Sequence, residues 1–314
     1  MKNKLIIGLF TGAVAVAVLV FLYSTSDNGI PGISSANVYC SAYGTLTSER
    51  PIQSHRSYCI KVSGEASNYD PNAPYVFAYS IVDDEGNVLK EFETAHEKIM
   101  HFIVVRKDLA NFAHVHPEFN ATTGEFTLVD LTFPFDGEYR LFADFTPTTS
   151  QIGSDGARLP VTVYHDVEVG NLDNYKPQSL GDSTSIKTVD DYQVALSSDA
   201  ALVTGWESLL MFTIEQAGQP VTDLEQYLGS LGHAVILREG DFQFIHTHPV
   251  DDPMASQTGY AHFMVSFAEA GKYKVFMQFQ HQGKIMTSDF IVNVAQGEDS
   301  SNEMEGMDMP GMNH

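Results

Sequence analysis

The sequence predicts an all-β protein with two tandem immunoglobulin-like β-sandwich domains behind an N-terminal transmembrane helix. Short apolar segments recur at regular intervals with turn residues between them, and this series occurs twice. A polar stretch without periodicity separates the two series, and a long apolar run precedes both. About seven strands in each unit of about 110–130 residues is typical of one sandwich.

The first predicted element is a membrane anchor. Residues 5–23 (LIIGLFTGAVAVAVLVFLY) carry no charge, and Lys2 and Lys4 precede them. This length spans a bilayer, and the lysines favour a cytoplasmic N-terminus. A cleaved signal peptide is the alternative, but its apolar core is usually shorter. We therefore expect an anchor or uncleaved signal over residues 1–26, with the remainder on the periplasmic or extracellular side.

Composition divides the rest of the chain. The expected parts are a Ser/Gly/Pro-rich tether (27–36), a first sandwich (37–170), a polar linker (171–188), a second sandwich (189–296) and a disordered Met/His-rich tail (297–314). The expected strands are 58–66, 75–82, 100–106, 111–116, 125–133, 138–145 and 160–169, then 190–198, 208–215, 232–238, 243–248, 259–267, 272–279 and 284–294. A short helical turn is expected within residues 223–231.

One motif occurs in both domains and contains six of the twelve histidines. Residues 101–117 (HFIVVRKDLANFAHVHP) and 233–249 (HAVILREGDFQFIHTHP) each begin with histidine. A second histidine follows thirteen residues later, and a third, before proline, fifteen residues later. The two trios are His101, His114 and His116, and His233, His246 and His248. Because imidazole is a common ligand of zinc, copper and nickel, the repeat predicts metal ligands. The alternative is a set of hydrogen-bonded histidines at the rim of each sandwich.

Each copy of the motif has the pattern of a β-hairpin, an apolar run, a polar break and a second run. A four-residue turn aligns Arg106 with Asn111, Ile103 with His114, and His101 with His116; in the second copy it aligns Arg238 with Gln243. Alternate residues of a strand share a face, and cross-strand neighbours lie about 5 Å apart. Each trio should therefore converge at one end of its hairpin. The spacing leaves open whether the trios form two sites or one.

The duplication continues beyond the histidines. Residues 133–145 (FPFDGEYRLFADF) align with residues 267–279 (FAEAGKYKVFMQF), which matches Phe142 with Phe276 and Tyr139 with Tyr273. Phe112 and Phe244 also correspond within the hairpins. A Gly-x-Tyr element in a sandwich is typical of a turn and a core strand, so we expect the two tyrosines to be structural corner residues.

The two copies differ in residues that could add ligands. The additional candidates are His96, Met100, His262 and His281, and Gly232 stands in the second copy where the first has Met100. Unequal ligand sets would give the sites unequal affinity or metal preference.

Charge and cysteine content limit the function classes. The net charge of −23 excludes nucleic acid as a partner, because phosphate binding needs the opposite sign. Cys40 and Cys59 are the only cysteines, and in an oxidising compartment they are expected to form one disulfide. No cysteine follows Cys59, which excludes a cupredoxin-type electron carrier.

The C-terminal segment EMEGMDMPGMNH (303–314) is the second strong metal signal. Its candidate ligands are Met304, Met307, Met309, Met312 and His314. The segment cannot build a core, so burial does not explain the methionines. Thioether sulfur favours Cu(I), so the tail favours copper over zinc as the metal.

The tail resembles the Met/His-rich copper-binding segments of exported bacterial copper-resistance proteins. The exported sandwich with histidines is also similar in kind to the small periplasmic copper-resistance sandwiches. The resemblance implies copper sequestration or delivery without catalytic turnover, in exchange with another copper-handling membrane or periplasmic protein.

Two other functions remain open at the level of sequence. One is a zinc-dependent hydrolytic enzyme, since three histidines leave a coordination position for water. Its general base has little support, because only Val250-Asp251 in the second copy matches Glu118 of the first. The other is a structural or adhesive immunoglobulin-like ectodomain.

Overall fold

A computed structural model describes residues 58–64, 68–153, 156–250 and 258–297, and the backbone alone of residues 38–39, 42–44, 246, 248 and 249. The apolar run at 5–23, Cys40 and the tail lie outside the described residues. Within the described part, β-strands dominate and no helix is long and apolar enough to cross a membrane. The prediction of an all-β protein is confirmed.

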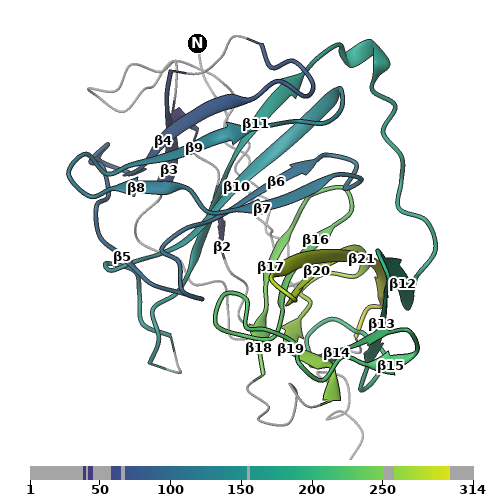
Figure 1. The fold of residues 1–314 in the computed structure, drawn as a ribbon. Helices are drawn as coiled ribbons and strands as arrows, with labels where there is room; N and C mark the ends of the chain where they lie inside the picture. Colours follow the sequence, from purple (N-terminus) through teal and green to yellow (C-terminus); the bar gives the residue numbers. More distant parts are fainter. Residues whose placement is uncertain are drawn as a thin grey trace, which may run out of the picture.

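The first sandwich consists of two antiparallel sheets (Figure 1). One has the order β1-β3-β4-β9-β8 and the other β2-β11-β10-β6-β7, with β5 pairing β10. The strands are β1 (Val38–Tyr39), β2 (Ala42–Gly44), β3 (Tyr58–Ser63), β4 (Tyr75–Asp83), β5 (Phe92–Glu93), β6 (His101–Arg106), β7 (Phe112–Val115), β8 (Glu118–Asn120), β9 (Glu125–Leu131), β10 (Gly137–Pro147) and β11 (Val161–Val169). Aromatic side chains such as Phe77, Tyr79, Phe102 and Phe126 fill the core between the sheets.

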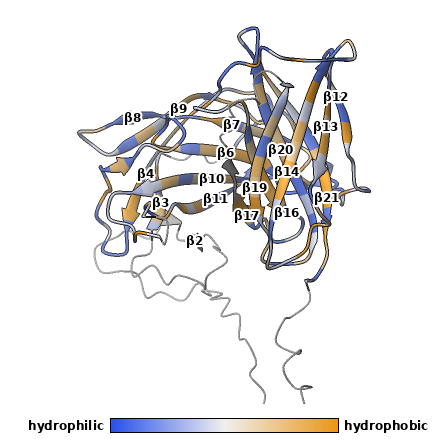
Figure 2. Ribbon diagram, turned by 90° about the horizontal axis from the view of Figure 1, so that it is seen from below, coloured by the Kyte–Doolittle hydropathy of each residue, from blue (hydrophilic) through white to orange (hydrophobic). Residues whose placement is uncertain are grey.

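The second sandwich repeats this plan. Its sheets have the orders β12-β13-β14-β19-β18, with β15 pairing β14, and β17-β16-β20-β21. The strands are β12 (Ile186–Val189), β13 (Tyr192–Ser198), β14 (Glu207–Gln216), β15 (Gln219–Pro220), β16 (His233–Arg238), β17 (Phe244–His246), β18 (His248–Pro249), β19 (Tyr260–Ser266), β20 (Gly271–His281) and β21 (Lys284–Val294). Apolar and polar residues alternate along many of its strands (Figure 2), and the buried apolar residues of both sheets form one core.

Every predicted strand segment has an observed counterpart whose ends differ by at most three residues. One local prediction was wrong. Residues 223–231 form no helix, because Tyr227 and Ser230 pair across a turn whose central residues, Leu228 and Gly229, have φ of 57° and 80°. The segment predicted as linker, residues 171–188, contains the short helix Leu172–Asn174 and the start of β12 at Ile186.

The two corner tyrosines have the predicted structural role. The Tyr139 hydroxyl donates to the carbonyl of Phe135 at 3.0 Å, and the Tyr273 hydroxyl donates to the carbonyl of Glu269 at 2.6 Å. Both rings are fully buried. Each bond spans four residues and fixes the turn before the long core strand, β10 or β20.

The two sandwiches pack against each other through the sheets that carry the histidine hairpins (Figure 1). In β6, Phe102 and Val104 face the core of the first sandwich, whereas Ile103 and Val105 face the second domain. In β16 the inward and outward faces alternate in the same way. Each strand is therefore buried on both faces, which explains why both read as continuous apolar runs.

The contact between the domains has approximate two-fold symmetry. Phe112 of the first domain stacks on Phe276 of the second, with ring centroids 4.1 Å apart. The matching residues make the reverse contact, since Phe244 of the second domain lies 5.6 Å from Phe142 of the first. Such an exchange of equivalent residues is the pattern of an isologous dimer interface, here within a single chain.

Cys59 is buried in β3 and is disulfide-bonded. The chain contains one other cysteine, Cys40, which lies outside the described residues. A disulfide of this kind persists in oxidising compartments.

Candidate metal centre

The first hairpin has the register that the sequence predicts. Ile103 lies opposite His114, and the backbone N–H of Arg106 donates to the carbonyl of Asn111 at 3.0 Å. His101 Nδ1 lies 3.1 Å from His114 Nε2 and 3.2 Å from His116 Nε2. The three imidazoles of the first trio therefore converge at one end of the hairpin, as predicted.

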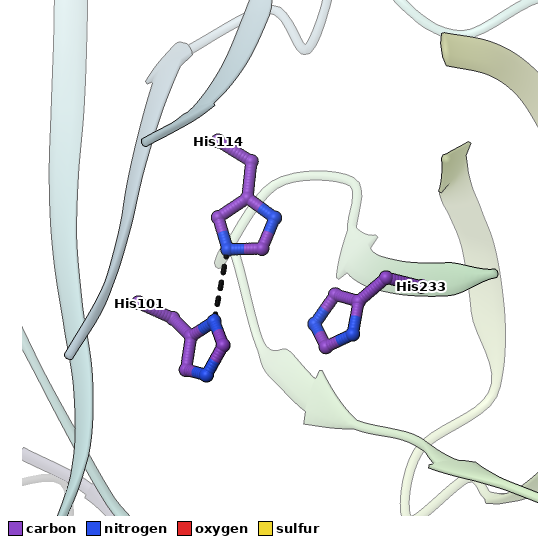
Figure 3. A group of neighbouring side chains, drawn as sticks. All are labelled: His101, His114 and His233. Carbon is purple, nitrogen blue, oxygen red and sulfur yellow. Dashed lines mark hydrogen bonds between the residues drawn. The ribbon is translucent and has the colours of Figure 1, made fainter. Parts of the chain in front are cut away.

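His233 joins this cluster from the second domain. Its ring stacks on His101 with centroids 5.4 Å apart and an interplanar angle of 10°, and its centroid lies 5.1 Å from that of His114. Nitrogen atoms of His101, His114 and His233 all lie within 4.8 Å of one another, and the three rings gather in the space between the hairpins (Figure 3). The group meets the geometric requirement for shared ligation of a metal ion, whose M–N bonds are about 2.0–2.1 Å long.

Strand alternation explains why these residues meet. His101 shares a face of β6 with Ile103 and Val105, the residues that contact the second domain. His233 shares the corresponding face of β16 with Val235 and Leu237. The histidine at the start of each strand therefore points into the same interface, and the cluster lies at the edge of its apolar contact.

The outward nitrogens of two rings are held by oxygen acceptors. His101 Nε2 lies 3.0 Å from the carbonyl oxygen of Ala95, and His114 Nδ1 lies 2.8 Å from Oε1 of Gln278. Because both oxygens accept, both of these ring nitrogens carry the proton. The inward atoms, His101 Nδ1 and His114 Nε2, then present lone pairs, which is the arrangement typical of metal-binding histidines.

Burial keeps His114 and His116 uncharged at neutral pH. Desolvation, and then the neighbouring His101, lowers the pKa of His114 to about 4. Desolvation, and then His114 and His101, lowers the pKa of His116 to about 3. His114 Nε2 and His101 Nδ1 lie 3.1 Å apart. A metal ion held by this group would coordinate these two nitrogens from one side.

His96 lies on a tight turn beside the cluster. Its ring centroid is 5.2 Å from that of His233 and 6.0 Å from that of His101. The turn joins Ala95 to Lys98, and His96 and Glu97 have φ of 49° and 63°, in the left-handed region that costs energy for residues other than glycine. A cavity of about 160 Å³ opens here and is lined in part by His96, His101 and Asp144. The cavity therefore borders the cluster at His101.

Other sequence-predicted ligands lie elsewhere. Met100, a possible additional ligand, is 1% exposed and packs in the core of the first sandwich. Gly232 stands at the matching position of the second copy, where an added Cβ would meet Met277 Cε at 2.6 Å and the Gln278 carbonyl oxygen at 3.1 Å, so a side chain there would require Met277 to move. His281 is also not part of the cluster, because its ring nitrogens lie 2.8 Å from the Tyr192 hydroxyl and 3.0 Å from Asp223 Oδ1.

The second hairpin is described in part. Val235 lies opposite His246, and the backbone N–H of Arg238 donates to the carbonyl of Gln243 at 3.1 Å, so its register is the predicted one. The side chains of His246 and His248 lie outside the described residues. His262, in β19, contacts the Tyr260 ring at 5.8 Å.

The sequence did not predict the part played by Gln278, which hydrogen-bonds to the cluster. Gln278 pairs with His233 in the β16–β20 ladder and reaches His114 in the other domain. A glutamine in a core strand has no metal-ligand signature. The available signal was its correspondence with Asp144, since both are polar residues within the aligned apolar runs LFADF (141–145) and VFMQF (275–279).

Comparison with known sequences places the chain in a family. The model of the family described as Domain of unknown function (DUF8832) matches residues 56–154 and 187–296, one range in each sandwich. The chain belongs to the DUF8832 family. No curated protein matches its sequence.

The solved structures that this DUF8832 protein resembles include tandem immunoglobulin-like domains. A marsupial T cell receptor is 10% identical, with 74% of this chain and 95% of that chain covered and a TM-score of 0.22. Titin Ig tandem domains are 11% identical, with 76% and 97% covered and a TM-score of 0.20. Domains 5–6 of the S-layer protein SbsC are 12% identical, with 76% and 97% covered and a TM-score of 0.22. Similarity at this level does not indicate a function for this chain.

Proposed function

We propose that this DUF8832 protein is a membrane-anchored, extracytoplasmic copper-binding protein that sequesters or delivers copper. The observation that carries the proposal is the convergence of four imidazoles, His101, His114, His116 and His233, at the contact of the two domains. Two of its rings are held by outer oxygens so that lone pairs face inward. Such a centre binds an ion without a folding change, as expected of a protein that stores or transfers a metal.

The choice of copper depends on the tail. Imidazole serves zinc and both oxidation states of copper, whereas thioether sulfur selects Cu(I). The methionines of residues 303–314 would therefore capture Cu(I), and ligand exchange would pass it to the cluster or to another copper-handling protein. The disulfide at Cys59 supports an oxidising compartment, and the apolar run at 5–23 supports an anchor.

The position of His233 supports one hairpin site per chain. His233 contacts the first trio, so a separate second site of the same kind would lack its leading histidine. The chain should therefore hold one tightly bound ion at the hairpins and additional Cu(I) at the tail.

Metal analysis tests this function directly. The full chain, purified from cells without added chelator, is expected to retain about one equivalent of copper after desalting. Electron paramagnetic resonance of the Cu(II)-loaded chain should show nitrogen hyperfine structure, and truncation after Gln296 should leave that signal in place. Retention of zinc with no copper would contradict the proposal and favour the hydrolase.

The tail is expected to add Cu(I) capacity independently of the sandwiches. Replacing Met304, Met307, Met309 and Met312 with leucine removes the thioethers but keeps the apolar bulk. Competition with a Cu(I) chelator should show fewer Cu(I) ions per chain, whereas Cu(II) binding and the melting temperature should not change. An unchanged Cu(I) stoichiometry would mean that the tail is no copper ligand.

A further inference from the structure

We infer that Gln278 is a positioning residue of the metal centre that acts across the domain interface. It holds His114 in the tautomer that can bind the ion. This inference rests on the proposed function, because it assigns the part of that site supplied by the second domain.

The contact is direct and buried. Gln278 is 6% exposed, and its Oε1 accepts from His114 Nδ1 at 2.8 Å. Its amide nitrogen donates to the Thr287 hydroxyl at 3.1 Å on the neighbouring strand β21. The second bond anchors the amide on β21 and leaves Oε1 as the acceptor for the imidazole. Gln278 also pairs with His233 in the ladder. This residue therefore lies next to one candidate ligand, His233, and orients another, His114.

The tautomer decides whether His114 can act as a ligand. With Nδ1 protonated, Nε2 directs its lone pair toward His101 Nδ1, 3.1 Å away. With Nε2 protonated, an N–H would occupy the position of the ion and the ring could not bind it. The hydrogen bond at one ring nitrogen sets which nitrogen carries the proton, and Gln278 supplies this bond.

The equivalent position in the first domain has a different chemistry. Asp144 pairs with His101 in the ladder, as Gln278 pairs with His233. A threonine on the neighbouring strand bonds to each residue, Thr162 to Asp144 and Thr287 to Gln278. The amide thus offers an acceptor to His114 without adding a second carboxylate to the centre. Because Asp144 stands in one copy and Gln278 in the other, the centre is not symmetric about the approximate two-fold axis.

The test compares variants of the full chain. Gln278→Leu keeps the bulk and removes the acceptor, so Cu(II) affinity should fall by about 10- to 100-fold. Gln278→Glu keeps an acceptor for His114, so its Cu(II) affinity should remain close to that of the wild type. Gln280→Leu is the matched control, because Gln280 lies in the same strand but bonds to Glu225, and its affinity should equal that of the wild type.

Nitrogen-15 NMR of the metal-free chain measures the tautomer of His114, which would not change if Gln278 only filled space. His114 should be protonated at Nδ1 in the wild type and in Gln278→Glu, and should shift toward the Nε2–H form in Gln278→Leu. If wild type and Gln278→Leu bind Cu(II) equally and have the same His114 tautomer, the inference is wrong while the proposed function stands. If the wild type binds no Cu(II), the proposed function fails, and an Nε2–H tautomer in that protein would reject the role of Gln278 as well.

Discussion

Replacing His233 with alanine is expected to lower the Cu(II) affinity of the hairpin cluster by about 100-fold or more, although His233 belongs to the domain opposite the complete trio. Loss of a residue that hydrogen-bonds to a ligand typically costs 10- to 100-fold in metal affinity, and removal of a ligand should cost at least as much. The physical reason is the position of its ring, which is 5.4 Å from His101 and 5.1 Å from His114. Isothermal titration with Cu(II) in a competing buffer measures the change.

His281→Gln is the matched control for this variant. His281 is a buried histidine of the same domain whose ring nitrogens contact Tyr192 and Asp223. Its replacement should lower stability without changing Cu(II) affinity. If His233→Ala binds Cu(II) as tightly as the wild type while His101→Ala does not, the centre belongs to the first domain alone.

The metal-free protein is expected to lose stability as the pH falls from about 7 to 4. The pKa values of His114 and His116 are lowered from 6.5 to about 4 and about 3 by burial and by neighbouring rings. In this range the unfolded chain binds protons at both residues and the folded chain does not. The unfolding free energy is therefore highest, as far as these two residues affect it, above pH 6.5, and it decreases as the pH falls toward 4 and 3.

The size of this effect follows from the shift at His114, the more buried of the two. A pKa lowered from 6.5 to about 4 corresponds to roughly 3 kcal/mol of unfolding free energy at its limit. His116 contributes less, because its half-exposed ring is partly screened by solvent. Urea unfolding of the chelated protein at pH 7.5, 6.0 and 5.0 measures the slope.

A variant with both residues replaced by glutamine separates this slope from that of the carboxylates. Asp166 and Asp289 also have pKa values lowered below the usual carboxyl value of 3.8. Their protonation therefore changes the unfolding free energy at a lower pH than that of the histidines. The variant should lose most of the dependence between pH 7.5 and 5.0. Equal slopes in the two proteins would mean that the histidines are protonated in the folded state.

The sequence by itself determined the strands, the duplication and the register of the hairpins. These features depend on local periodicity and turn residues, and a register that buries one face is strongly specified. Convergence of His101, His114 and His116 followed from this register. Met100 precedes His101 in the chain but packs in the core of the first sandwich, so adjacency in sequence did not place it in the cluster.

Only the tertiary structure decided that the centre lies between the domains. The continuous apolar runs of β6 and β16 were the available signal, since a strand buried on both faces must face a second layer. They did not indicate which layer, because docking depends on surfaces far apart in sequence. His114 and Gln278 are separated by 164 residues, and no local pattern relates them. The chain therefore determined each hairpin locally, whereas the contact of the two sandwiches determined which histidines share a site.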